Sequence, residues 1–130
     1  MDLNFRWVWL DDAKVCLSIA AHGNMQTADF KEVFRSVGEA LASVDGATLI
    51  DLRQARWNLA ATDIAAVALA FKENRLRMGN KIALVCSRDI DRYGELLVVA
   101  SAASNQGLKA RAFYDLGRAL EWMAQKPLYC

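Results

Sequence analysis

A continuous apolar run, ATLIDL at residues 47–52, lies near the middle of the chain. It is too short for a helix, and its apolar side chains follow one another instead of alternating with polar ones. This pattern is typical of a strand that is covered on both faces, as in a parallel sheet. A second run of this kind, KIALVC, occupies residues 81–86. We therefore expect two central strands, with a crossover between them.

Predicted helices separate and flank these runs. Apolar residues recur at helical spacing in three stretches, and an alanine- and serine-rich stretch predicts one more helix. The expected helices cover residues 27–44, 62–78, 93–105 and 115–126. Thr62 and Asp115 are the expected N-caps of the second and the fourth. A further strand is expected at residues 109–114, before the last helix.

The amino-terminal segment predicts a β-hairpin. Residues 3–10 and 14–21 both alternate in polarity, and Asp11-Asp12 between them is a short turn. Two strands joined by so short a turn pair antiparallel. Trp7 and Trp9 fall on one face of the first strand. They belong to the core if helices cover them, and otherwise they form an exposed aromatic patch suited to a dimer interface.

The order of predicted elements indicates the fold class. The order is β-β-α-β-α-β-α-β-α, and alternating strands and helices imply a parallel sheet with right-handed crossovers. The hairpin adds one antiparallel strand. No linker, repeat or low-complexity tract interrupts the sequence. We predict one α/β domain over residues 1–130, with a mixed, mostly parallel five-stranded sheet and helices on its faces.

Charge and composition indicate which classes of partner and which cellular compartment to expect. Sixteen basic residues balance fifteen acidic ones, so the basic excess typical of nucleic-acid-binding proteins is missing. No apolar stretch approaches the roughly 20 residues of a bilayer-spanning helix, and the first residues do not resemble a signal peptide. Cys16, Cys86 and Cys130 lack the spacing of disulfide or metal sites. We expect a cytoplasmic protein with no integral membrane segment and no nucleic-acid partner.

The sequence lacks the motifs of common active sites. His22 is its sole histidine, which leaves few ligands for a metal centre and one base for any hydrolytic scheme. Neither a nucleophile elbow nor a glycine-rich phosphate loop occurs. We therefore expect no catalytic residues, no metal and no cofactor, and we expect that the protein is not an enzyme.

A ligand site is expected where the parallel strands end. Ligands of open parallel sheets bind beyond the carboxyl ends of the strands, and these loops carry arginines and aromatic residues able to hold an anionic or amphiphilic molecule. The candidate ligand-binding residues are Arg53, Arg56, Trp57, Ser87, Arg88 and Tyr93. In the competing interpretation the arginines are solvated and Trp57 covers the edge of the core, which is the more common arrangement.

Three segments carry a resemblance that extends over nearly the whole chain. They are residues 48–52 (TLIDL), residues 81–85 (KIALV) followed by Asp89 and Tyr93-Gly94, and Ala112-Phe113 followed by Asp115, Ala119-Leu120 and Trp122. Together they resemble the SpoIIAA-like family, which is related in fold to the STAS domains of anti-sigma-factor antagonists. The resemblance implies a domain that works by binding rather than by making or breaking bonds.

One stretch departs from the STAS pattern. STAS-type antagonists carry a phosphorylatable serine in an Asp-Ser-Ser-Gly segment after the central strand, whereas residues 58–63 of this chain are NLAATD. Thr62 is the only hydroxyl nearby and is therefore the candidate phosphoacceptor. Its role as an N-cap is the favoured interpretation.

Two functional hypotheses follow from these observations. The first is a non-enzymatic regulatory or interaction domain that contacts a protein partner, with a homodimer as one form of that contact. The alternative is a domain that binds or senses a small anionic or lipid-like ligand. The alternative predicts a concave pocket bordered by Arg53, Trp57 and Tyr93.

Overall fold

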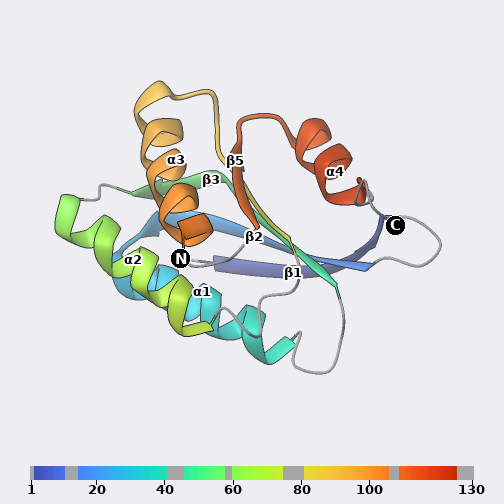
Figure 1. Cartoon of the computed structure of the whole chain (residues 1–130), viewed down its shortest axis with the longest axis horizontal. Coiled ribbons are helices and arrows are strands. Elements are labelled where there is room, and N and C mark those ends of the chain that lie inside the picture. Colours follow the sequence, from blue (N-terminus) through green and yellow to red (C-terminus); the bar gives the residue numbers. More distant parts are fainter. Residues whose placement is uncertain are drawn as a thin grey trace.

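The computed structural model describes residues 2–10, 15–40, 46–57, 60–74, 81–105 and 109–125. Its elements, in chain order, are β1 (Asp2–Trp9), β2 (Val15–Met25), α1 (Thr27–Ala40), β3 (Ala47–Trp57), α2 (Ala61–Asn74), β4 (Ile82–Val85), α3 (Ile90–Asn105), β5 (Ala110–Phe113) and α4 (Leu116–Ala124) (Figure 1). This is the predicted order. The predictions for residues 11–14, 41–44, 58–59, 75–78 and 126, and for Cys130, lie outside the described residues.

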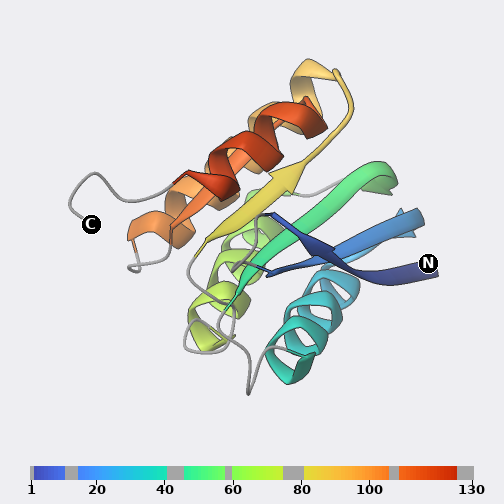
Figure 2. The same ribbon diagram turned by 90° about the vertical axis from the view of Figure 1, so that its right-hand side faces the viewer.

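The described strands form one sheet in the order β1-β2-β3-β4-β5. β1 runs antiparallel to β2, and the other neighbours pair in parallel. The predicted five-stranded, mostly parallel sheet is confirmed. Each crossover joins adjacent parallel strands, so crossovers of one hand place α1, α2 and α3 on the same face. The last helix, α4, lies on the opposite face (Figure 2).

Two apolar cores lie on the two faces of the sheet. The main core, between the sheet and helices α1 to α3, includes Phe34 and Ile50. The α4 core, between the sheet and α4, includes Leu49 and Met123. Successive residues of a strand point to opposite faces, so the neighbours Leu49 and Ile50 enter different cores. This double burial is the reason why the apolar residues of 47–52 do not simply alternate with polar ones.

β2 and β3 are longer than predicted. They end at Met25 and Trp57, four and five residues beyond the ends that the polarity pattern predicts. The two strands remain paired up to these residues after a register shift next to Ala20. Gly23, within the extension, has a φ of 94°, which glycine adopts readily. The shift breaks the alternation of polarity, and for this reason the extension of β3 resembles a loop in the sequence.

The start of α2 differs from the prediction. The carbonyl of Ala60 accepts hydrogen bonds from the backbone N–H groups of Asp63 and Ile64, so Ala60 occupies the cap position. The carboxylate of Asp63 in turn accepts the N–H of Ala60 at 3.0 Å. Thr62 is an exposed residue of the first turn. The N-cap prediction for Thr62 is wrong because the Asp63 carboxylate reaches back to the helix start and satisfies the donor there.

Aspartate side chains cap helices α3 and α4. The side chain of Asp115 accepts from the backbone N–H of Arg118 at 3.1 Å, which confirms the predicted cap of α4. Asp89 accepts from two backbone N–H groups of the first turn of α3, at 3.0 and 3.3 Å. This cap starts α3 at Ile90, earlier than predicted. Tyr93 therefore lies inside the helix and not at its start.

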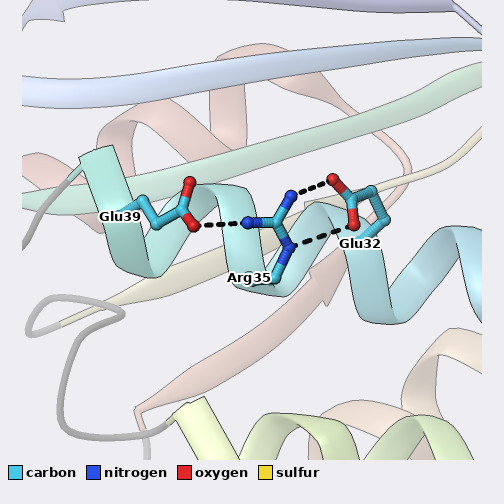
Figure 3. A network of polar contacts seen from close by, with 3 residues as sticks. All are labelled: Glu32, Arg35 and Glu39. Carbon is cyan, nitrogen blue, oxygen red and sulfur yellow. Dashed lines mark hydrogen bonds and ion pairs between the residues drawn. The ribbon is translucent and has the colours of Figure 1, made fainter.

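Arg35 joins two carboxylates on the exposed face of α1 (Figure 3). Its guanidinium contacts Glu32, three residues before it, and Glu39, four residues after it. The hydrogen bond from Arg35 lowers the pKa of Glu32. Exposed pairs at this spacing support a helix locally and are screened by salt. This cluster therefore stabilises α1 and does not mark a binding site.

Candidate functional site

The predicted ligand residues lie near the carboxyl ends of two neighbouring strands. Three of them lie on β3, namely Arg53, Arg56 and Trp57. The other three follow β4, namely Ser87, Arg88 and Tyr93. Ser87 is half-buried beside Arg88, and Arg56 is exposed on β3 opposite Asn24 of β2. The remaining four border three different recesses, and of these four only Arg88 and Tyr93 line the same one.

The first recess lies between α2 and α3 and has a volume of about 660 Å³. Trp57, at its side, is 8% exposed, and its indole N–H donates to Oε2 of Glu95 at 2.5 Å. The guanidinium of Arg92 lies 5.6 Å from the centre of the indole ring and donates to the carbonyl of Ala55 at 3.4 Å. The polar edge and a face of the indole are therefore occupied by the protein's own side chains. Trp57 closes the edge of the main core, as in the competing interpretation.

The second recess, which we call the tyrosine recess, is lined by Arg88, Asp89, Tyr93 and Tyr114 and has a volume of about 270 Å³. The two tyrosine rings meet edge to face with centroids 5.0 Å apart. The guanidinium of Arg88 lies 5.6 Å from the centre of the Tyr114 ring. Aromatic walls beside a cation can hold an apolar or flat group that carries a negative charge.

The tyrosine recess brings together two of the predicted candidate residues, Arg88 and Tyr93, with two residues outside that candidate set, Asp89 and Tyr114. Arg88 and Tyr93 come from the loop after β4 and from α3. Tyr114 comes from the residue directly after β5. Its position at the end of a parallel strand was the available sequence signal.

Arg53 lies on the opposite face of the sheet, in a groove of about 210 Å³ that it lines together with Arg6 of β1 and Leu120 of α4. Both its Nε and its Nη2 donate to the carboxylate of Asp51 at 2.9 Å. These hydrogen bonds raise the pKa of Arg53, so the guanidinium already has an anionic partner. Arg53 and Trp57 therefore lie on different faces of the sheet. Among the described residues, no single pocket is bordered by Arg53, Trp57 and Tyr93 together, although the ligand-binding hypothesis predicts one.

An aromatic strip, formed by Phe5, Trp7 and Trp9, lies exposed along β1. The side chains of these residues are on the face of the main core, to which Leu3 of the same strand contributes. The helices do not cover them, since Phe5 is 45% exposed, Trp7 47% and Trp9 70%. Of the two alternatives for Trp7 and Trp9, the structure shows the exposed patch.

Within the described sheet, β1 also presents an open backbone edge. It lies at one end of the strand order, and every residue from Asp2 to Trp9 pairs with β2 without a register shift. Only Leu3 and Val8 are partly buried, and the rest of the strand is exposed. Edge strands that are long, regular and apolar pair readily with another chain. The aromatic strip and this edge together form the largest candidate contact surface on β1.

The buried cysteines are poorly suited to nucleophilic chemistry. Burial raises the pKa of Cys16 to about 12, although a backbone hydrogen bond from Leu49 opposes the shift. Burial also raises the pKa of Cys86. Thiolates are the reactive form, so the raised pKa values lower the reactivity of both thiols. Within the described ranges, no cluster of three or more histidine, cysteine, aspartate or glutamate side chains could hold a metal ion.

Comparison with known proteins identifies the fold. No protein-family model and no curated protein matches the sequence. Among solved structures, the chain is similar to an uncharacterised DUF3478-family protein from Shewanella loihica PV-4 that has a SpoIIAA-like fold. The two chains are 17% identical, the TM-score is 0.61, and the match covers 93% of each.

The fold is SpoIIAA-like. The predicted resemblance is confirmed at the level of the fold. At this sequence identity the likeness carries no activity or partner from the Shewanella protein to this chain. None of the described helices is both long and apolar enough to span a membrane.

Proposed function

We propose that this protein is a non-enzymatic regulatory or interaction domain that acts by direct contact with a protein partner at β1. One observation carries the proposal: Phe5, Trp7 and Trp9 are exposed side by side on an edge strand. Aromatic residues are enriched at the centres of protein interfaces and dominate their binding energy. An exposed apolar patch of this kind is typical of an interaction site.

Covering the strip would remove a large apolar area from water. A tryptophan side chain buries on the order of 200 Å², and about half of Trp7 and more than half of Trp9 are still exposed. Covering roughly 100 Å² of apolar surface on each residue would contribute about 2 to 3 kcal/mol for that residue. The open backbone edge of β1 adds directional hydrogen bonds to an incoming strand.

Thr62 offers a means of regulation within this proposal. It is exposed in the first turn of α2, and its hydroxyl is not needed as the helix cap. A phosphate on Thr62 would lie near the positive end of the helix dipole, although beside the Asp63 carboxylate. Intact-mass measurement of protein from its own cells tests this: a phosphate-sized increase that is absent from Thr62→Ala supports it, and an unchanged mass contradicts it.

Partner capture in cells tests the proposed contact. The wild-type protein, the double variant Trp7→Ala/Trp9→Ala and the control Leu97→Ala would each be expressed at natural levels and crosslinked. Leu97 is a matched control because it is 44% exposed on α3, away from β1. We expect one specific partner with the wild-type protein and the control, and its loss with the double variant. The same partners in all three samples would rule out β1 as the contact.

The tyrosine recess supports a second candidate function, the binding of a small anionic or lipid-like ligand. Its support is the grouping of Arg88, Tyr93 and Tyr114 around a recess at the ends of the parallel strands. Native mass spectrometry of gently purified protein would show the ligand as an added mass that denaturation removes. Arg88→Ala and Tyr114→Ala should lose this mass, whereas the control Arg56→Ala should keep it. A bare chain in every sample would contradict this function.

A further inference from the structure

We propose that the partner of β1 is a second copy of this chain, bound through antiparallel pairing of the two β1 strands about a two-fold axis at Asn4. The pairing would join two five-stranded sheets edge to edge. This inference rests on the proposed function, because it names the partner of the same surface. Three features of β1 support it: the face of the sheet on which each side chain lies, the direction of the backbone N–H and C=O groups, and the positions of the charged residues.

The side chains of β1 divide between the two faces of the sheet. Leu3 packs on the main core, on the face that carries the aromatic strip. Val8 packs on the α4 core, and Asn4 and Arg6 line the groove beside α4. Residues that lie directly opposite each other in an antiparallel pair share a face. Two β1 strands can therefore match faces only when the axis passes through a residue and not between two residues.

The backbone pattern gives the same requirement. Because β1 pairs with β2 without a register shift, alternate residues direct their N–H and C=O groups away from β2. When the axis passes through a residue, the residues whose backbone N–H and C=O groups point away from β2 lie opposite the same kind of residue in the partner strand. The free edge of β1 can then form a regular ladder with the same edge of a second copy.

The two charges of β1 select the register. Asp2 and Arg6 are its charged residues, and they stand on the same face, two positions before and after Asn4. An axis at Asn4 sets each Asp2 opposite the partner's Arg6. It also sets Leu3 opposite the partner's Phe5. The segment Asp2–Arg6 is thus complementary to itself in charge and in polarity.

Axes at the next three residues of β1 leave the charges poorly matched. An axis at Arg6 sets two arginines directly opposite each other, which destabilises a strand pair. An axis at Phe5 sets Asp2 opposite the partner's Val8, and an axis at Trp7 leaves Asp2 beyond the paired segment. With the axis at Asn4, the paired residues of β1 are 2–6, Trp7 lies diagonal to the partner's Leu3, within reach of a long aromatic side chain, and Val8 and Trp9 lie beyond the pairing.

Charge reversal tests this pairing. Sedimentation equilibrium at low salt should show a wild-type dimer that weakens as salt is raised. The single variants Asp2→Arg and Arg6→Asp each place like charges opposite each other twice per dimer, and we expect self-association to weaken about tenfold. The double variant Asp2→Arg/Arg6→Asp restores both opposite-charge pairs and should regain most of the wild-type affinity.

Control variants separate this effect from misfolding and locate the axis. Glu121→Arg, on the exposed surface of α4, should leave the dimer unchanged, and circular dichroism should show the wild-type fold in every variant. In a Cys130→Ser background, Asn4→Cys should form a disulfide-linked dimer more readily than Phe5→Cys. The opposite order of crosslinking would overturn the register.

The outcomes also distinguish this inference from the proposed function. A wild-type protein that stays monomeric at high concentration, or a dimer that the single reversals do not weaken, overturns self-pairing. If Trp7→Ala/Trp9→Ala still loses a cellular partner in that case, the interaction function remains. If the charge swap restores the dimer but the double tryptophan variant loses no other partner, self-pairing holds and contact with a different protein is contradicted.

Discussion

At the residue scale, the buried thiol of Cys16 links stability to pH. The side chain is fully buried in the α4 core, and desolvation raises its pKa from 9.0 to about 12. In the unfolded chain the thiol loses its proton at a lower pH than in the folded protein. The neutral thiol therefore contributes full stability below pH 9, and this contribution is lost as the pH rises towards 12.

The wild-type protein should therefore lose stability faster than Cys16→Ala at alkaline pH. A group with a raised folded pKa lowers the free energy of unfolding by up to about 1.4 kcal/mol per pH unit between its two pKa values. Urea unfolding of both proteins at pH 7, 9 and 10.5 measures the difference. We expect a constant difference up to pH 9 and a shrinking one above it. Parallel curves across the whole range would contradict the assigned burial of the thiol.

Two tryptophans of the chain should respond very differently to the same substitution. Trp57→Phe removes the hydrogen bond to Glu95 and leaves a gap at the edge of the main core. We expect a loss of about 1 to 3 kcal/mol in the free energy of unfolding. Trp9→Phe is the matched control, because Trp9 is largely exposed, and it should change stability by less than about 0.5 kcal/mol. Urea unfolding measures both, and equal losses would be inconsistent with these packing roles.

At the scale of the element, the carboxylate caps show which helix starts the sequence can predict. Asp115 is both predicted and observed as an N-cap, because a residue with a short polar side chain stands directly before the apolar periodicity. The starts of α2 and α3 depend on Asp63 and Asp89 instead. In α2 the capping carboxylate belongs to Asp63, which lies inside the helix, and for this reason the N-cap was wrongly predicted at the neighbouring Thr62.

Removal of the α4 cap should destabilise the protein without changing its fold. Asp115→Ala leaves the N–H of Arg118 without its acceptor, and loss of an N-cap costs about 1 kcal/mol. Glu121→Ala, a matched exposed position on the same helix, should stay within about 0.5 kcal/mol of the wild type. Thermal and urea unfolding with circular dichroism measure the two variants. A larger loss for Glu121→Ala would contradict the cap assignment.

At the scale of the whole molecule, the protection of the sheet should fall from its centre to β1. β3 is paired on both sides and covered by both cores, whereas β1 is paired with β2 alone within the described sheet and is mostly exposed. Backbone amides exchange through local opening, which is easier where few side chains are buried.

Hydrogen exchange followed by mass spectrometry measures this gradient. In dilute solution we expect the amides of β1 to exchange at least about tenfold faster than those of β3. Raising the protein concentration should slow exchange in β1 selectively if two copies pair there. Equal protection of β1 and β3 in dilute solution would contradict the open edge.

The order of the elements, the mostly parallel sheet and the cap of α4 could be predicted from the chain alone. These features depend on local periodicity and on burial, and both leave a direct trace in neighbouring residues. The run at residues 47–52 has apolar residues on both faces of the strand (Ala47 and Leu49 on one, Ile50 and Leu52 on the other) because a core covers each face. The SpoIIAA-like resemblance drew on the same local patterns.

Tertiary packing decides the features that bear on function. A register shift between β2 and β3 extends both strands and separates Arg53 from Trp57, because one extra residue changes the face that a side chain occupies. The exposure of Trp7 and Trp9 likewise depends on how far the helices reach across the sheet. No local sequence pattern shows the register shift or the exposure of the two tryptophans, since each arises from contacts between segments that are distant in the chain.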